Sequence, residues 1–101
     1  MAEDEPLIQI HGVVINPTTG EVSIQGNPVT LAKSEFLLLR FFASHPGVVY
    51  TRQQIIDATG GPDYPVTERS VDVQVTGLRK RLGDMGQLIE TVRGVGYRFR
   101  A

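Results

Sequence analysis

The chain has 101 residues, of which 41% are hydrophobic and 21% charged, and it contains no cysteine. This length fits one domain with one modest core. The missing thiols exclude disulfides and thiolate metal sites, and no apolar run approaches the ~20 residues that span a bilayer. Residues 1–6 lack the features of a secretory signal, so we expect a disordered tail there and a single domain over 7–101 in a cytoplasmic protein.

The net charge of −1 conceals a gradient along the chain. Residues 1–65 hold three basic and seven acidic side chains, a net charge of −4, whereas residues 66–101 hold seven basic and four acidic ones, a net charge of +3. A local basic surface, more than the net charge, decides where a polyanion docks. The last third of the chain is therefore the part that could bind nucleic acid.

The first thirty-one residues predict an antiparallel meander. Four short segments rich in β-branched residues, at 7–10, 13–15, 21–24 and 29–31, are separated by Gly, Pro and Asn breakers. At Lys33 the apolar spacing changes to a helical period, which predicts a first helix ending near residues 45–47. Phenylalanine and leucine crowd most of its surface, as in a central, buried helix.

The start of this first helix is expected to be poorly capped, because Ala32 offers no side-chain oxygen at the N-cap position. Residues 48–50 are then expected to form a short strand or an extended link. A second helix over 51–59 opens with a capping box formed by Thr51 and Gln54, and a loop rich in Gly and Pro follows it.

The third helix is expected over residues 68–82, between Thr67 as N-cap and Gly83 as the stop signal. One arc of its helical wheel is apolar and forms a core face, made of Val71, Val75, Leu78 and Leu82. The opposite, outward face contains no glutamate and consists mainly of small side chains: Arg69, Ser70, Val73, Thr76, Gly77 and Lys80, with Asp72 and Arg79 on a flank.

Such an outward face suits the major groove of DNA. Methyl groups of Val73 or Thr76 can contact the thymine 5-methyl, and the hydroxyls of Ser70 or Thr76 can bond to base edges. Arg69 and Lys80 at the two ends can reach phosphates, which fix the register. Periodicity alone does not decide between this reading face and an ordinary surface helix that exposes one valine.

Residues 88–92 and 97–100 predict a β-hairpin around a glycine-containing loop. Tyr97 and Phe99 would share its buried face, and Arg98 and Arg100 the other. Arg93 lies at the expected tip, where it could enter a narrow, negative minor groove. A helix for one groove and a basic hairpin for the next favour DNA binding over an ordinary surface helix.

With these elements in place, the chain resembles the C-terminal effector domain of OmpR/PhoB-family response regulators, most of all the PhoB-like ones, over residues 7–100. The resemblance is carried by Leu31 with Ser34-Glu35-Phe36-Leu37-Leu38-Leu39, by His45-Pro46-Gly47-Val48-Val49-Tyr50-Thr51-Arg52, by Arg69-Ser70-Val71-Asp72-Val73, by Leu78-Arg79-Lys80-Arg81-Leu82-Gly83, and by Thr91-Val92-Arg93-Gly94-Val95-Gly96-Tyr97-Arg98-Phe99. It implies an α+β winged helix-turn-helix with an N-terminal four-stranded antiparallel sheet, three helices and a C-terminal β-hairpin wing.

The resemblance also implies sequence-specific binding of double-stranded DNA for transcription regulation, with the recognition helix at 68–82 in the major groove and Arg93 of the wing in the minor groove. The expected DNA-binding residues are Arg52, Arg69, Ser70, Val73, Thr76, Gly77, Arg79, Lys80 and Arg93. A loop for contact with RNA polymerase is expected at Gly60, Gly61, Pro62, Asp63, Tyr64, Pro65, Val66 and Thr67.

Further partners follow from the resemblance. Such domains bind direct-repeat sites as head-to-tail dimers, and a receiver domain with a phosphoacceptor aspartate precedes them. That receiver is absent here, which leaves a stand-alone effector or a fragment of a longer two-component phosphorelay protein; we expect the fragment, without cofactor or metal. Thr76 and Gly77 stand where PhoB-like relatives often carry arginine, Gln74 where histidine is common, and Gly60 where tryptophan is common. These departures predict a different operator.

Two competing interpretations remain open. An enzyme has little support, because His11 and His45 are isolated in the sequence and no catalytic or metal-binding spacing is present. The serious alternative is a winged-helix protein-interaction module with weak or lost DNA binding, favoured by the overall acidity and by Gly60 and Gly77. Asp72 is expected to form a structural ion pair instead of accepting from a cytosine.

Overall fold

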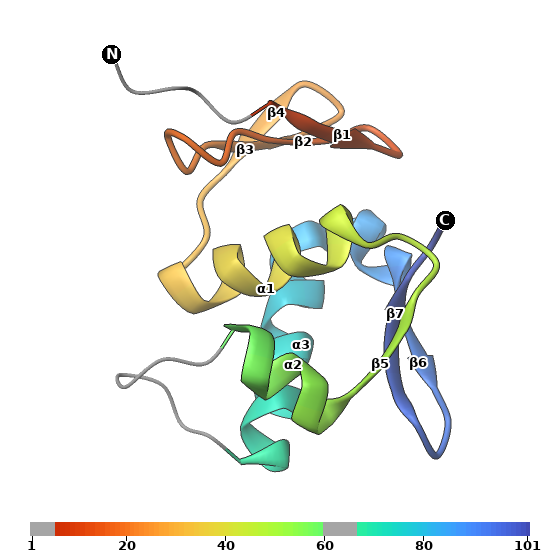
Figure 1. Cartoon of the computed structure of the whole chain (residues 1–101). Coiled ribbons are helices and arrows are strands. Elements are labelled where there is room, and N and C mark those ends of the chain that lie inside the picture. Colours follow the sequence, from red (N-terminus) through yellow and green to blue (C-terminus); the bar gives the residue numbers. More distant parts are fainter. Residues whose placement is uncertain (1–5, 60–66) are drawn as a thin grey trace.

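The structure, a computed structural model, describes residues 6–59 and 67–101 (Figure 1). Its elements in chain order are β1 (Ile8–Ile10), β2 (Val13–Ile15), β3 (Val22–Ile24), β4 (Asn27–Val29), α1 (Lys33–Ser44), β5 (Val49–Thr51), α2 (Arg52–Thr59), α3 (Glu68–Leu82), the 3₁₀ helix η1 (Gly83–Leu88), β6 (Ile89–Val92) and β7 (Gly96–Phe99). Strands β1 to β4 form one antiparallel sheet in that order, and β5, β7 and β6 form a second. The order of elements is that of the expected winged helix.

Two tight turns connect neighbouring strands at one end of the four-stranded sheet. His11 and Gly12 join β1 to β2 with φ angles of 52° and 81°, and Gln25 and Gly26 join β3 to β4 with 50° and 84°. Two successive positive φ angles define the type I′ turn that matches the twist of a hairpin. The prediction of a strand over 29–31 is therefore wrong by two residues, because β4 begins directly after Gly26.

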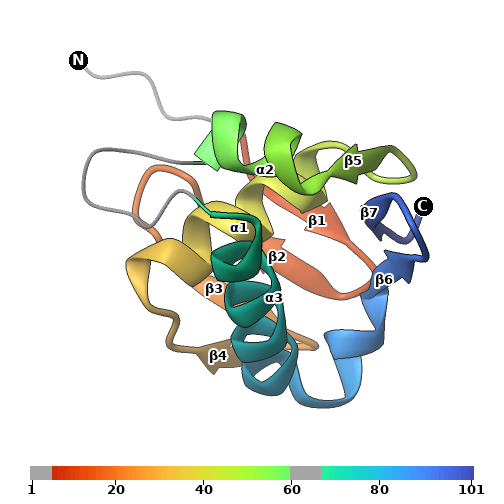
Figure 2. The same cartoon turned by 90° about the horizontal axis from the view of Figure 1, so that it is seen from below.

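One face of this sheet packs into the core. Alternate residues of β2 and β3 are at most 8% exposed and belong to the same buried cluster as Leu38, Leu39 and Phe42 of α1: Val13, Ile15, Val22 and Ile24. Figure 1 shows the sheet as a layer above α1, and in Figure 2, the view from below, the helices lie in front of that layer. The buried helix expected from the phenylalanine and leucine pattern is thereby confirmed.

The starts of the helices agree with the sequence signals. Thr51 Oγ1 accepts from the Gln54 backbone N–H at 3.1 Å while Gln54 Oε1 accepts from the Thr51 N–H at 2.8 Å, which is the full capping box. Thr67 Oγ1 accepts from the Ser70 N–H at 3.1 Å. At α1 the weak start is partly compensated, because Glu35 Oε1 accepts from the Ala32 N–H at 2.9 Å.

The second sheet ties the C-terminus to the middle of the chain. β5 pairs with β7 from Val49 opposite Arg98 to Thr51 opposite Gly96, so the segment left open as strand or link is an edge strand. The chain also continues beyond Gly83 as η1, which the stop signal at that glycine did not predict. Within residues 6–59 and 67–101, no helix has the length and apolar character needed to cross a membrane.

Candidate nucleic-acid interface

Helix α3 has the two faces that its wheel predicts. Its buried side chains are Val71, Val75, Leu78 and Leu82, each at most 4% exposed. Val73 on the opposite face is 65% exposed. Two open hollows flank it, one of about 540 Å³ lined by Arg69, Asp72, Val73, Thr76, Gly77 and Lys80, and one of about 350 Å³ lined by Thr67, Arg69, Ser70, Val73 and Gln74. Val73 and Arg69 line both hollows.

The two hydroxyl groups expected to meet base edges make hydrogen bonds within the helix. Thr76 Oγ1 donates to the Asp72 carbonyl oxygen at 2.9 Å. Ser70 Oγ lies 2.6 Å from Thr67 Oγ1, the N-cap oxygen. The hydroxyl proton of Thr76 is therefore already used, whereas its oxygen can still accept a hydrogen bond.

Asp72 joins α3 to two other elements. One carboxylate oxygen accepts from Arg52 Nε of α2 at 2.6 Å and from the Tyr97 hydroxyl of β7 at 2.5 Å. The hydrogen bond from Tyr97, together with Arg52, lowers the pKa of Asp72 against the opposing effect of burial. Burial and the bond to Asp72 raise the pKa of Tyr97. The expected structural ion pair of Asp72 is confirmed, and its partner is Arg52.

Arg79 makes a second joint between α3 and the hairpin. Its Nε and Nη2 both donate to the Ile89 carbonyl oxygen, at 3.0 and 2.6 Å, and Nη2 also donates to Thr91 Oγ1 at 2.8 Å. The guanidinium groups of Arg79 and Arg52 lie 5.5 and 5.3 Å from the centre of the Tyr97 ring, within cation–π range. The fork of Arg79 is thus engaged with β6, and DNA contact by Arg79 stays a prediction.

Most of the remaining arginines of the last third are paired with acids. Arg98 and Arg100 bind Glu90 at 3.0 and 3.3 Å and lower the pKa of that carboxyl group. Arg81 lies 3.5 Å from Glu35. By contrast, no carboxylate within residues 6–59 and 67–101 pairs with Arg69, Lys80 or Arg93. Fewer basic side chains are consequently available to a polyanion than the count over 66–101 indicates.

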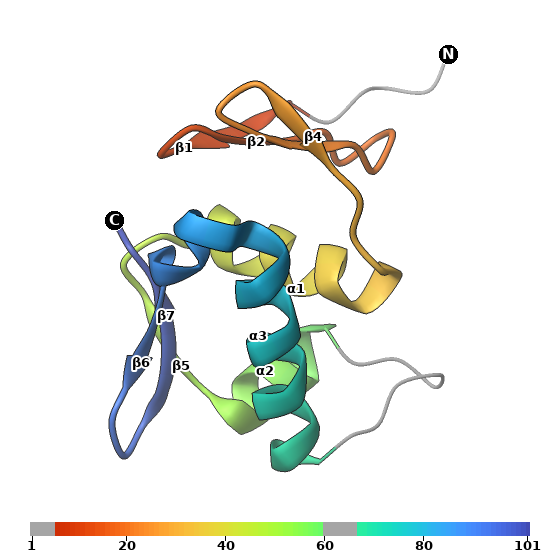
Figure 3. The ribbon, with the colours of Figure 1, turned by 180° about the vertical axis from the view of Figure 1, so that it is seen from behind.

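The hairpin of β6 and β7 stands beside α3 and projects away from the four-stranded sheet (Figure 3). Tyr97 and Phe99 are 5% and 0% exposed, which confirms the predicted inner face. Arg93 is exposed in the turn between the strands, next to Gly94, which adopts a φ of 78°. The exposed face of α3 and the exposed Arg93 therefore belong to two elements that Asp72 and Arg79 hold together.

Gly77 packs against α1, and this contact explains why a residue without a side chain stands at position 77. A Cβ built there would lie 3.3 Å from Glu35 Oε2, closer than most side-chain contacts. The other oxygen of Glu35, Oε1, accepts from the Ala32 N–H and lies 3.5 Å from Arg81 Nε. The absence of a side chain at Gly77 thus leaves room for this carboxylate. Gly77 also lines the larger hollow on the outer surface.

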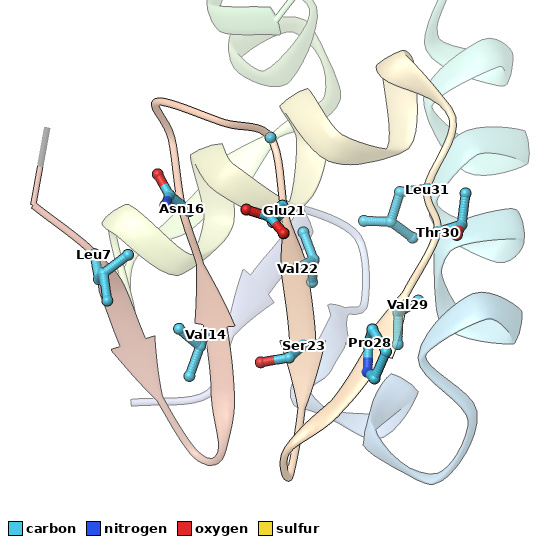
Figure 4. A pocket seen from close by; sticks show the side chains of 11 residues that line it. Leu7, Val14, Asn16, Glu21, Val22, Ser23, Pro28, Val29, Thr30 and Leu31 are labelled. Atoms are coloured by element: carbon cyan, nitrogen blue, oxygen red, sulfur yellow. The ribbon is translucent and has the colours of Figure 1, made fainter. Parts of the chain in front are cut away.

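Another hollow, of about 500 Å³, lies on the outer face of the four-stranded sheet, far from these cations. Figure 4 shows Val14, Ser23 and Pro28 on that face, with Glu21 nearby. Its lining is apolar or neutral except for one carboxylate, which repels phosphate. A polyanion is therefore expected at α3 and the hairpin, and not at this sheet.

Comparison with known proteins agrees with this geometry. The family described as "Transcriptional regulatory protein, C terminal" matches residues 26–99. PhoB of Pseudomonas aeruginosa, a phosphate regulon transcriptional regulatory protein, is 41% identical over 98 residues. The chain belongs to the OmpR/PhoB family. The PhoB alignment covers 96% of this chain but only 43% of that regulator, so the chain spans less than half of such relatives.

Two solved structures establish the fold of this family member. The DNA-binding domain of RstA from Klebsiella pneumoniae, crystallised in complex with the RstA box, superposes with a TM-score of 0.83 at 32% identity and covers 95% of this chain and 98% of that one. The OmpR/PhoB homologue DrrB of Thermotoga maritima superposes with a TM-score of 0.81 at 32% identity, over 94% of this chain and 44% of that one. The winged-helix prediction is confirmed.

The structure of this OmpR/PhoB domain adds residues that the sequence did not single out. Tyr97 was predicted only as a buried residue, yet its hydroxyl bonds to Asp72. Glu90 and Glu35 hold arginines that the charge gradient counted as available. Of the expected polymerase loop, residues 60–66 lie outside the described residues, and Thr67 is the N-cap of α3.

Proposed function

We propose that this domain binds double-stranded DNA sequence-specifically and thereby regulates transcription. The observation that carries the proposal is the exposed face of α3, where Val73 lines two hollows and the cations at both ends have no carboxylate partner within residues 6–59 and 67–101, beside a hairpin that exposes Arg93. α3 would lie in the major groove and Arg93 would enter the adjacent minor groove. The domain would act in the cytoplasm.

The expected DNA-binding residues divide into two groups under this proposal. Residues that face outward would contact DNA directly: Arg69, Val73, Thr76, Gly77, Lys80 and Arg93. Ser70, Arg52 and Arg79 make intramolecular bonds and would act mainly by fixing the position of α3 relative to α2 and the hairpin. The part of the guanidinium of Arg52 that is not bonded to Asp72 can also reach a phosphate.

Three further partners belong to the proposal because the chain covers less than half of its regulator relatives. A receiver domain would precede this domain in the full protein and control it by phosphorylation. Two copies would bind direct repeats head to tail. The segment from Gly60 to Thr67 would contact RNA polymerase.

Selection from random duplex DNA, followed by titration of the enriched sequence over a salt series, tests the proposal. An enriched motif is expected, with a log–log salt slope of roughly −0.9 per neutralised phosphate. Arg69→Ala should reduce the slope by about 0.9, one phosphate contact. Arg81→Ala, which removes an arginine of the same helix that is paired with Glu35, is the matched control and should leave the slope nearly unchanged.

Arg93→Ala tests the wing separately. It should weaken binding most at sites whose minor groove is rich in A·T pairs, because a narrow groove concentrates negative potential. Equal losses on all flanking sequences would reduce Arg93 to a phosphate contact.

The interaction-module alternative gains one observation, the pairing of Arg81, Arg98 and Arg100 with carboxylates. Failure to enrich any sequence, both for the domain and for the same domain joined to a receiver, would favour that alternative and reject the proposal.

A further inference from the structure

We infer that Glu90 keeps the two arginines on the outer face of the hairpin, Arg98 and Arg100, away from the DNA backbone, so that the wing binds DNA through Arg93 instead of through additional phosphate contacts. This inference rests on the proposed DNA binding and adds a residue that limits its sequence-independent part. Three features support it: the bonds of Glu90, the place of the two arginines on the hairpin, and the small contribution of exposed ion pairs to stability.

Glu90 of β6 uses both of its carboxylate oxygens to bind these arginines. Oε1 accepts from Arg98 Nε at 3.0 Å, and Oε2 accepts from Arg100 Nε and Nη2, both at 3.3 Å. Arg98, and to a smaller extent Arg100, lower the pKa of Glu90 against the opposing effect of burial, so the carboxylate is charged at neutral pH. Two guanidinium groups therefore share one negative charge.

The register of the second sheet fixes the place of Arg98. Glu90 lies directly opposite it on β6, and Val49 lies opposite it on β5. Side chains alternate between the two faces of a strand, and the residues on either side of Arg98 are buried, so Arg98 and Arg100 face outward. Their side chains are 43% and 46% exposed. Within residues 6–59 and 67–101, no other carboxylate pairs with either arginine.

A wing that enters the minor groove brings Arg98 close to a DNA strand. Arg98 is two positions beyond Gly96, the first residue of β7, and thus about 7 Å along the strand from the loop that holds Arg93. The minor groove is only about 6 Å wide, and a phosphate backbone forms each of its walls. α3 lies on the inner side of the hairpin (Figure 3), so the outer face turns toward the wall farther from α3. Arg100 lies two positions farther from the loop than Arg98.

Stability alone does not account for the pairing of Glu90 with both arginines. Exposed ion pairs contribute little to the stability of a folded protein, because solvent and salt screen them. Phosphate contacts, in contrast, supply nearly all of the sequence-independent affinity of a DNA-binding protein. A carboxylate beside a wall of the minor groove repels phosphate and also occupies the donors of two arginines. The main effect of Glu90 is therefore on DNA binding.

Salt titrations of Glu90→Gln test the inference. Glutamine has the shape of glutamate without its charge, so the hairpin should fold normally, which hydrogen exchange at β6 and β7 checks. Binding to a duplex of scrambled sequence should tighten, and its log–log salt slope should become steeper by about 0.9, the value for one added phosphate. The same change is expected on the selected duplex, because phosphate contacts carry no sequence information. Glu21→Gln removes a carboxylate beside the four-stranded sheet and makes the same change in net charge, yet it should leave the slope nearly unchanged.

Two double variants identify the arginine that Glu90 restrains. Glu90→Gln with Arg98→Ala should return to the wild-type slope, whereas Glu90→Gln with Arg100→Ala should keep the steeper one, although both have the net charge of the wild type. A slope that Glu90→Gln leaves unchanged on both duplexes overturns the inference. Equal slopes of the two double variants overturn the assignment to Arg98.

The scrambled duplex separates this inference from the proposed function. A steeper slope of Glu90→Gln on scrambled DNA, without any enriched motif, supports the restraint by Glu90 and rejects sequence-specific recognition. An enriched motif whose binding ignores Glu90→Gln supports the proposed function and rejects the restraint. Absence of binding to either duplex, for the wild type and for Glu90→Gln, rejects both.

Discussion

The Tyr97 hydroxyl of β7 donates to the same Asp72 oxygen that accepts from Arg52 Nε, at 2.5 and 2.6 Å. One carboxylate of α3 thus binds a residue of α2 and a residue of the hairpin. Helix and wing can present a fixed relative geometry to two grooves only if such cross-links hold. Asp72 and Arg79 provide them from positions about two turns apart on the same helix.

Tyr97→Phe removes one hydrogen bond from this centre and should lower the free energy of unfolding by about 1.5–3 kcal/mol, the range for a bond to a charged group. Asp72→Ala should be at least as damaging, and the double variant should lose less than the sum, because both changes remove one shared bond. Urea denaturation of the four proteins measures the coupling. Asp84→Ala combined with Tyr97→Phe is the control pair, and additive losses are expected there. Additivity for Asp72 and Tyr97 would show that the bond contributes nothing to stability.

Stability should depend on pH in the acid range. Asp72 and Glu90 have lowered pKa values in the folded domain, so their contribution is fully present above the ordinary carboxyl range of about 4 and is lost as the pH falls through the lowered values. Urea midpoints measured between about pH 6 and pH 2.5 should fall. Asp72→Asn should flatten this dependence, whereas Asp84→Asn, which removes an exposed carboxylate, should not. Parallel curves for the wild type and Asp72→Asn would contradict the prediction.

Arg79→Lys keeps the charge but loses the fork that binds the Ile89 carbonyl and Thr91. We expect faster hydrogen exchange at the amides of β6 and β7, a stability loss of about 1–3 kcal/mol, and weaker binding without a change in the selected central bases. Hydrogen exchange combined with DNA selection separates the two roles of Arg79. A changed base preference together with unchanged hydrogen exchange in β6 and β7 would show instead that Arg79 contacts DNA in the groove.

Two glycines should respond oppositely to alanine. A Cβ at Gly96 would overlap the Tyr50 carbonyl oxygen, a backbone atom of the paired strand, so Gly96→Ala should separate β5 from β7 and lower stability by about 3 kcal/mol. At Gly77 the neighbour is the end of the Glu35 side chain, which can move, and alanine favours a helix by up to about 1 kcal/mol. Gly77→Ala should therefore be neutral or stabilising. Thermal denaturation distinguishes them, and equal losses would refute the contrast.

The helices could be predicted because their signals are local. The capping box of Thr51 and Gln54 and the apolar arc of α3 each depend on residues within one or a few turns. The start of β4 was missed because Gln25 takes a positive φ, a conformation that favours Gly, Asn or Asp and leaves no mark on a glutamine. The type of each element could thus be predicted from the sequence, whereas the register of this turn could not.

The site shows the same division between local and distant information. The wheel predicted correctly that Val73 faces outward, since exposure follows from helical period. It could not predict that Arg79 binds the Ile89 carbonyl or that Glu90 binds Arg98 and Arg100, because those partners meet only after the hairpin has packed against α3. A sequence count of charges therefore overstated the cations available for DNA.

The position of β7 has a consequence for the synthesis of the protein. β7 is the central strand of its sheet, its partner β5 precedes α2, and Phe99 is fully buried. During translation the three helices emerge from the ribosome before Phe99 does, so they must wait with an unfilled core and an unpaired β5 edge. Emergence of β7 from the ribosome, and not the formation of any helix, is then the event that completes folding of this domain.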